Sequence, residues 1–375
     1  MDKTGTGKEL TVMKPFMPPL DEFKSYLERI WDSRRLSNDG AIHREFEQAL
    51  CGYLGVRHIS LFANGTLALM IAIKALDLKG EIITTPFTSV ATAQAIYWNN
   101  LKPVFVDINK TDYNISLSGI EEAITPHTQA ILPVHLFGNP CDLDGIERVA
   151  HKNKLKLVYD AAHCFGVTMK GISVCNFGDL SVLSFHATKV FSSFEGGAII
   201  CHDESTKRHI DALKNTGLGP DHKLEGYGIN AKMNEFQAAY GLIQLKYVGK
   251  VIACRREVSL KYRQLFKGIR GLSMPGEKVS VDYNYSYFPV VIDPDQFGST
   301  RDEVADYLEK KNIFARKYFY PLVCDHKEFS MYKRYDLSVA RKTAENILCI
   351  PLFHDISDED IEMIAGSIIR MNRVL

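Results

Sequence analysis

One lysine stands in a segment that could hold it for covalent chemistry. Lys189 lies between two short apolar runs, 181–185 and 198–200, and Gly196 and Gly197 punctuate the second. Each run is typical of a buried strand, so we expect the lysine in a loop that is held at both ends. Loss of hydration disfavours the ammonium form and leaves a nucleophilic amine, which is what a Schiff-base lysine needs. Most lysines are solvated surface groups, so this segment by itself leaves the surface interpretation open.

A single carboxylate upstream gives the lysine a partner. Asp160 follows the apolar run 155–159, which predicts a buried strand that ends at this carboxylate. Ligands of open α/β sheets bind beyond the carboxyl ends of the strands. A lysine and a carboxylate at neighbouring strand ends are typical of pyridoxal 5'-phosphate (PLP) sites, because the lysine holds the aldehyde and the carboxylate keeps the pyridine nitrogen protonated. The sequence therefore predicts PLP as the cofactor, with Lys189 and Asp160 as the catalytic residues.

Strands and helices alternate around these residues. The expected strands lie at 58–62, 81–85, 103–106, 130–136, 155–159, 181–185 and 198–200, and the expected helices between them at 67–76, 90–98, 119–124 and 143–152. This alternation predicts an α/β fold with a mainly parallel sheet that helices cover on both faces.

The length of 375 residues exceeds that of one compact core and predicts a large and a small domain. We expect a disordered tail at 1–14, a large cofactor-binding domain at 15–249 and a small α/β domain at 250–375. Further expected elements are a helix opened by 230–237 that ends near 248, helices at 255–265 and 301–310, strands at 285–292 and 313–319, a polar connector after 322 and a final helix after 352.

Composition excludes several classes of protein. The chain has 45 basic and 45 acidic residues, so nothing favours nucleic acid or an anionic membrane surface as a partner. It has neither an apolar run of transmembrane length nor the apolar core of a signal peptide near its start. The eight cysteines show no metal-ligand spacing and are expected as reduced thiols of a cytoplasmic enzyme without a metal.

A turn after the first strand of the alternation offers a phosphate site. Gly65 allows close approach of the backbone, Thr66 adds a hydroxyl donor, and the helix that follows has free N–H groups at its start. An ordinary N-capped helix is the alternative interpretation.

Three motifs give the chain a family resemblance. Asp160-Ala-Ala-His163, the segment 184–189 (Ser-Phe-His-Ala-Thr-Lys) and the segment 195–197 (Glu-Gly-Gly) resemble the DegT/DnrJ/StrS-type nucleotide-sugar aminotransferases. The resemblance extends from about Pro15 to the C-terminus. It implies the fold of type-I PLP enzymes and a transamination in two stages, in which an amino donor leaves its nitrogen as pyridoxamine phosphate and a keto sugar then accepts it.

The same resemblance assigns further cofactor contacts. It implies that Ser184 joins the turn at 63–66 in holding the phosphate, that Phe87 stacks on the pyridine ring, and that His163 lies on the other face, where many relatives carry glutamine. For Phe87, packing in the core is the alternative. It also implies that Asn230 reaches the cofactor phosphate of the partner subunit, in a homodimer with shared active sites. A simple N-cap or loop asparagine is the alternative there.

Three residues are expected to contact substrate. His135 lies at a strand end, His186 lies beside the lysine, and Tyr320 belongs to the segment 312–320. That segment, together with 15–20 and 185–191, resembles the subgroup that aminates dTDP-4-keto-6-deoxyglucose at C4, with L-glutamate as the donor. A C3 aminotransferase of a related 3-keto sugar remains an alternative. A pyridoxamine-dependent sugar dehydratase is disfavoured, because those relatives replace the lysine with histidine. A catalytically dead sugar-binding protein is disfavoured as well, since the lysine and the aspartate are both present.

Overall fold

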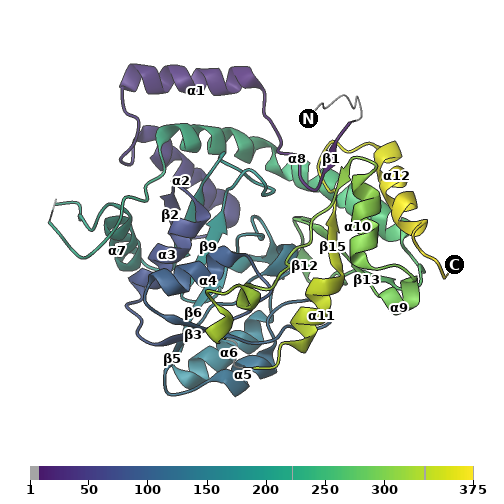
Figure 1. The fold of residues 1–375 in the computed structure, drawn as a ribbon. Coiled ribbons are helices and arrows are strands. Elements are labelled where there is room, and N and C mark those ends of the chain that lie inside the picture. The colour runs from purple at the N-terminus through teal and green to yellow at the C-terminus, as the bar shows by residue number, and fades with distance from the viewer. Residues whose placement is uncertain (1–7, 222, 333–334, 375) are drawn as a thin grey trace.

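A mixed seven-stranded sheet forms the centre of the larger part of the molecule (Figure 1). The structure is a computed structural model that describes residues 8–221, 223–332 and 335–374. The strand order is β2-β10-β9-β6-β5-β3-β4. The strands are β2 (His58–Phe62), β3 (Glu81–Thr84), β4 (Lys102–Phe105), β5 (Thr128–Ile131), β6 (Lys156–Asp160), β9 (Leu180–Ser184) and β10 (Gly197–Cys201). Only β10 runs antiparallel to its neighbours in this sheet, and the other pairs are parallel. The predicted α/β fold class is confirmed.

Helices cover both faces of this sheet. One face packs against α3 (Gly65–Ala75), α4 (Val90–Trp98) and α7 (Glu204–Lys214), and the other against α2 (Ala41–Leu54), α5 (Leu117–Ala123), α6 (Leu143–Asn153) and the first half of α8. Successive strand residues point to opposite faces, so Val182 enters the first core and Leu183 the second. Because both faces are buried, the strands read as continuous apolar runs.

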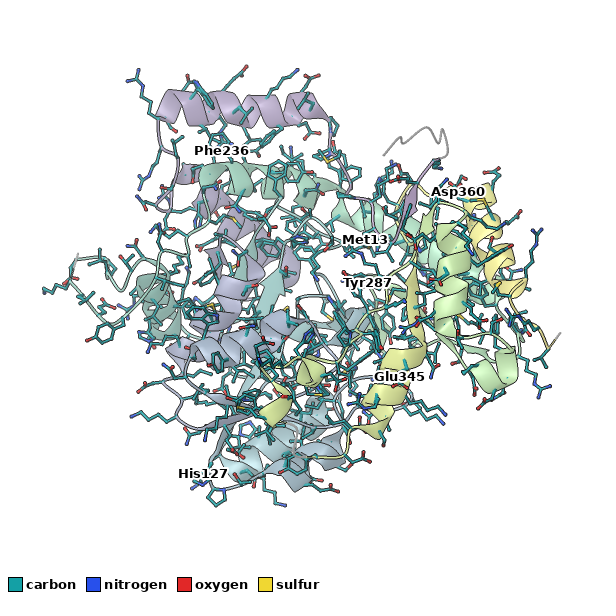
Figure 2. The ribbon with its side chains drawn as sticks, viewed as in Figure 1. Met13, His127, Phe236, Tyr287, Glu345 and Asp360 are labelled. Atoms are coloured by element: carbon teal, nitrogen blue, oxygen red, sulfur yellow. The ribbon has the colours of Figure 1, made fainter. Side chains whose placement is uncertain are left out.

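One long helix, α8 (Glu235–Leu265), connects the two parts of the molecule (Figure 1). Asn234 and Gln237 form a capping box at its start. The expectation of two separate helices, ending near 248 and restarting at 255, is wrong, because Val248 and Val251 continue the buried stripe across the expected break. Helix α1 (Leu20–Ser33) lies over α8, where Phe236, labelled in Figure 2, meets an aromatic ring of α1 edge-on.

The C-terminal part is a smaller α/β unit with its own core. Strands β11 (Leu272–Ser273), β13 (Phe288–Ile292) and β15 (Ile347–Ile350) form an antiparallel sheet. Helices α9 (Pro294–Phe297), α10 (Arg301–Glu309) and α12 (Asp358–Ile369) surround it, together with the second half of α8. Position 250 lies inside α8, and the division into domains at that position stays a prediction.

Three segments differ from the expectation. The predicted tail at 1–14 is wrong for its described end, because β1 (Leu10–Thr11) pairs with β14 (Ile313–Phe314) and Leu10 is buried; residues 1–7 lie outside the described ranges. The expected strand at 313–319 is a strand only over β14. The expected polar connector contains α11 (Ser338–Asn346), whose first amides bond to the Asp107 carboxylate.

The remaining elements are short. Strands β7 (Thr168–Met169), β8 (Ile172–Ser173) and β12 (Val281–Asp282) form a small sheet, and 3-10 turns lie at Leu136–Gly138, Val174–Asn176, Val323–Asp325 and Ser330–Tyr332. Within the described ranges, no helix is long and apolar enough to cross a membrane.

Candidate active site

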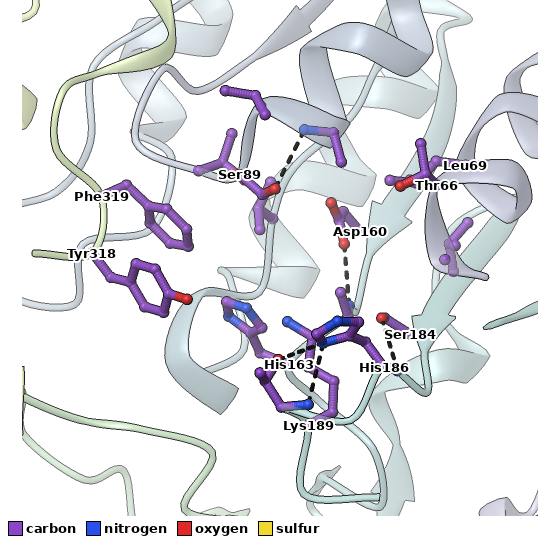
Figure 3. A pocket seen from close by; sticks show the side chains of 18 of the residues that line it. Thr66, Leu69, Ser89, Asp160, His163, Ser184, His186, Lys189, Tyr318 and Phe319 are labelled. Atoms are coloured by element: carbon purple, nitrogen blue, oxygen red, sulfur yellow. Dashed lines mark hydrogen bonds between the residues drawn. The ribbon is translucent and has the colours of Figure 1, made fainter. Parts of the chain in front are cut away.

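A cavity of about 550 Å³ opens beyond the carboxyl ends of β6 and β9. The segment 317–321 from the C-terminal part closes one side of it, and the start of α3 lies on another (Figure 3). Among the predicted site residues, those that line the cavity are Gly65, Thr66, Asp160, His163, Ser184, His186, Lys189 and Tyr320. Phe87, His135 and Asn230 do not line it. The structure therefore brings together the catalytic pair, the phosphate turn and part of the expected substrate wall.

Lys189 is held in a turn with its amine enclosed. Its backbone N–H donates to the carbonyl oxygen of His186 at 2.9 Å. Burial lowers the pKa of the Lys189 ammonium, against the opposing influence of Asp160 and Tyr318. A lowered pKa increases the share of free amine near neutral pH, which a nucleophile requires.

Asp160 lies buried at the end of β6 with two donors on its carboxylate. The backbone N–H of Ala162 donates to Oδ1 at 3.1 Å and the Thr92 hydroxyl donates to Oδ2 at 2.9 Å. Burial raises the pKa of Asp160, while these two hydrogen bonds and Lys189 oppose the shift. A buried carboxylate of this kind gains most from a cation brought to it, so the site fits the protonated pyridine nitrogen of PLP.

The start of α3 fits a phosphate. Asn64 caps the helix, because its side chain accepts from Leu67 N at 2.9 Å and its carbonyl accepts from Ala68 N at 3.2 Å. Gly65 and Thr66 are the first two residues of the helix, whose N–H groups have no partner within it. A Cβ atom at Gly65 would lie 2.9 Å from Cβ of Ser184, so glycine is required for this close approach. The resulting cradle presents amides and hydroxyls to an anion.

His163 has a defined tautomer. Its Nδ1 accepts the backbone N–H of Phe137 at 3.2 Å, so a neutral ring carries its proton on Nε2. Burial lowers the pKa of His163 well below its usual value, and the nearby Lys189 adds to this. The ring is therefore neutral and offers one N–H donor.

Two residues that were expected to contact cofactor or substrate lie outside the cavity. Phe87 is fully buried outside the cavity, where its ring packs edge-on against Phe137 and Phe319. His135 is also fully buried, its ring stacked on that of Tyr159 at 4.6 Å, and it belongs to the core. The stacking of Phe87 on the pyridine ring, which the family resemblance implies, and the substrate contact of His135 stay predictions. From the turn after β3, Ser89 lines the cavity.

Asn230 lies on the surface of this chain. It is exposed, and its Oδ1 accepts a hydrogen bond from Lys232 at 2.8 Å. Its expected contact with a partner subunit stays a prediction, as do the substrate contacts of His186 and Tyr320.

Sequence reasoning missed several residues at the cavity. Tyr287 comes from a segment that was expected only as a strand of the small domain, and Tyr318 and Phe319 lie in the segment 312–320, where only Tyr320 was expected at the site. Tyr287 lies near the centre of the molecule in Figure 2, and its ring centroid is 5.9 Å from the Lys189 amine. No local motif marks these aromatic residues, since folding brings them to the lysine from distant parts of the chain.

A buried lysine and a buried carboxylate that meet at the carboxyl edge of such a sheet, with a phosphate cradle beside them, define the fold-type-I class of PLP-dependent enzymes. Residues 20–369 match the model of the DegT/DnrJ/EryC1/StrS aminotransferase family, and the chain belongs to that family. It is thus a PLP-dependent aminotransferase, as its motifs predicted.

Within this family, the chain is similar to proteins whose names give their product. The chain is 48% identical over 365 residues to a dTDP-4-amino-4,6-dideoxy-D-glucose transaminase of Shigella dysenteriae, covering 96% of this chain and 98% of the relative. It is 44% identical over 361 residues to an Escherichia coli protein of the same name, covering 94% and 96%. The crystal structure of DesI in the presence of its TDP-sugar product has a TM-score of 0.94 at 34% identity, covering 97% of this chain and 93% of that one.

Proposed function

We propose that this protein transfers the amino group of L-glutamate to C4 of dTDP-4-keto-6-deoxy-D-glucose, which yields dTDP-4-amino-4,6-dideoxy-D-glucose. The observation that carries the proposal is the 48% identity, over nearly the whole of both chains, to a transaminase named for this product. Lys189 and Asp160 in one cavity supply the residues that the reaction requires. DesI, whose structure was determined with a TDP-sugar product, supports a dTDP-linked substrate.

Six residues of the cavity have a proposed task in this reaction. When bound, PLP supplies an electron sink that makes the hydrogen on the amine-bearing carbon acidic. Lys189 would hold the aldehyde group of the cofactor at rest. As a free amine, it would move that proton between the amine-bearing carbon of the substrate and the former aldehyde carbon of the cofactor. Asp160 keeps the pyridine nitrogen protonated. The cradle at Gly65, Thr66 and Ser184 binds the phosphate, and the Nε2–H of His163 is the donor for the phenolic oxygen.

We also propose that the working unit is a homodimer in the cytoplasm, in which Asn230 completes the phosphate site of the partner. Support comes from the exposure of Asn230 and from its position outside the cavity of its own chain. We propose further that the amino sugar nucleotide, the product of the reaction, is a building block for the O-antigen of lipopolysaccharide.

The test compares dTDP-4-keto-6-deoxyglucose with its 3-keto isomer, each with glutamate and PLP. We expect a 4-amino sugar nucleotide from the first and far slower transfer to the second. Replacement of Lys189 by alanine should lower turnover by about a thousandfold or more while dTDP-sugar still binds. In the wild-type protein, borohydride should fix the mass of the cofactor on the peptide that contains Lys189, and a label on another lysine would refute the assignment.

A further inference from the structure

A row of polar contacts runs along the wall of the cavity beside Lys189. Glu195 Oε1 lies 3.3 Å from Nε2 of His186, and Nδ1 of His186 lies 2.8 Å from Oγ1 of Thr188. Thr188 in turn lies near the Tyr287 hydroxyl, where it opposes the rise in the pKa of Tyr287 that burial causes. We call these four residues the His186 network, and all of them line the cavity.

The hydrogen bonds determine which nitrogen of His186 carries the proton. The backbone N–H of Thr188 points to Nδ1 at 3.2 Å, and an amide can only donate, so Nδ1 must hold a lone pair. The proton of the neutral ring is then on Nε2, which faces the Glu195 carboxylate, an acceptor. Both ring nitrogens are engaged by groups of the protein, so His186 connects Glu195 to Thr188 and leaves only its ring face for a substrate.

The network is anchored at the end that bears Glu195. The carbonyl oxygen of Glu195 accepts from Nε2 of Gln237 at 2.6 Å and from the Ser193 hydroxyl at 2.9 Å. Gln237 belongs to the capping box of α8, so this anchor is part of a rigid element. The Glu195 side chain therefore projects from a fixed backbone.

The other end of the network surrounds the lysine. The carbonyl of His186 accepts the backbone N–H of Lys189 at 2.9 Å, which closes the turn that carries the amine. Tyr287 lies over that amine, with its ring centroid 5.9 Å from Nζ. A rotation of the His186 ring would break both bonds that Thr188 makes to Nδ1, the one from its backbone N–H and the one from its hydroxyl. The orientation of the imidazole thus sets the position of the lysine turn.

We propose that Glu195 is a positioning residue for the transfer reaction: by holding His186 as the Nε2–H tautomer, it fixes the turn of Lys189 against Tyr287. The proposal depends on the proposed function only through the role of Lys189. Glu195 itself touches no reacting atom in this arrangement. Its substitution should therefore lower kcat and leave the KM for the sugar nucleotide nearly unchanged.

The chain contains a matched control pair. His58 Nδ1 lies 3.3 Å from Glu204 Oε2, the same distance and the same chemistry, outside the cavity. A histidine–glutamate pair on a protein surface contributes little to stability. Replacement of Glu204 by alanine should therefore leave kcat and KM unchanged.

The experiment compares Glu195→Ala, Glu195→Gln and Glu204→Ala as PLP-loaded enzymes. We expect Glu195→Ala to lower kcat about tenfold, the loss of one orienting polar contact with a charged group, with KM changed less than twofold. Glu195→Gln should recover most of kcat, because its amide oxygen still accepts from Nε2–H. Melting temperatures of the three variants should agree within a few degrees, since these side chains are half exposed.

A second readout does not depend on activity. In wild-type enzyme with ¹⁵N-labelled histidine, the His186 resonances, assigned by their loss in His186→Gln, should show a protonated Nε2 and an unprotonated Nδ1. The Glu195→Ala spectrum should show a mixture of tautomers, because without Glu195 the ring can rotate away from the Thr188 N–H that requires a lone pair on Nδ1. A protonated Nδ1 in wild type, a Glu195→Ala kcat equal to that of Glu204→Ala, or a Glu195→Gln as slow as Glu195→Ala would overturn the proposal. Failure of the proposed function looks different, since wild type and Lys189→Ala would then be equally inactive whatever the spectrum shows.

Discussion

Replacement of Asp160 by asparagine separates the catalytic task of this carboxylate from its effect on stability. Asparagine has the same shape, and its amide oxygen can still accept the backbone N–H of Ala162. The Thr92 hydroxyl can rotate to accept from the new NH₂ group and donate to Thr88, whose hydroxyl oxygen is 3.1 Å away. We therefore expect Asp160→Asn to fold normally with its buried hydrogen bonds satisfied.

The lost quantity is a negative charge beside the pyridinium. Two unit charges about 4 Å apart interact by about 4 kcal/mol at an effective dielectric constant of about 20. Because each 1.36 kcal/mol is about tenfold in rate, Asp160→Asn should slow both half-reactions by about a thousandfold. The assay follows the absorbance of the bound cofactor in a single turnover. Glutamate starts the first half-reaction and the keto sugar starts the second.

Stability without cofactor should change in the opposite direction. Burial raises the folded-state pKa of Asp160, so its protonated form is the one that favours folding. This contribution is fully present below the unfolded pKa of about 3.9 and is lost as the pH rises through the folded-state value. PLP-free Asp160→Asn should therefore melt at a higher temperature than PLP-free wild type at pH 7, and the difference should shrink toward pH 4. Added PLP should raise the melting temperature of wild type more than that of the variant.

The control is Asp179, which lies just before β9 and accepts a bond from the start of β6. Its Oδ2 accepts the backbone N–H of Leu157 at 2.8 Å, a bond that asparagine can keep. Asp179→Asn should react at the wild-type rate. Near wild-type turnover in Asp160→Asn, or a PLP-free melting temperature at pH 7 well below that of wild type, would refute the reasoning.

Three further predictions follow from the site. Gly65→Ala places a Cβ against the end of β9 and should weaken PLP binding at least about tenfold in a fluorescence titration, whereas Gly52→Ala, in open space within α2, should not; equal affinities would contradict the phosphate cradle. Phe87→Leu should lower the free energy of unfolding in urea by about 1 kcal/mol, because the ring is fully buried; a large loss of PLP affinity beside it would support the stacking role, and an unchanged affinity would contradict that role. Asn230→Asp mixed with Lys189→Ala should regain part of the activity if the asparagine acts on the partner, since one heterodimer site then carries neither change; no recovery despite subunit exchange would exclude that role.

Elements and residues with a local signal could be predicted from sequence. The strand ends before Asp160 and Lys189 follow from apolar runs that burial on both faces of a sheet demands. The glycine at position 65 follows a strand and opens a helix, and the structure shows that a Cβ there has no room. In each case the cause lies within a few residues of the effect.

Features that depend on residues far along the chain could not be predicted from sequence. Strand β1 forms because β14 pairs with it, and α11 begins where Asp107 offers its carboxylate, yet both partners are remote in sequence. The position of Phe87 after β3 gave no information on how its ring packs, because that depends on Phe137 and Phe319, which are remote in sequence. Tyr287 at the lysine depends in the same way on the docking of the C-terminal part.

The place of β2 in the sheet has a consequence for biosynthesis. Its only neighbour in the seven-stranded sheet, within the described residues, is β10, which the ribosome makes much later. At about 5–20 residues per second, roughly 7 to 28 seconds pass between the two strands. The phosphate cradle therefore remains incomplete until Ser184 and β10 have emerged, and PLP must be acquired late. Ribosome-bound chains should retain PLP when α8 has left the exit tunnel and fail to retain it when synthesis stops before residue 197.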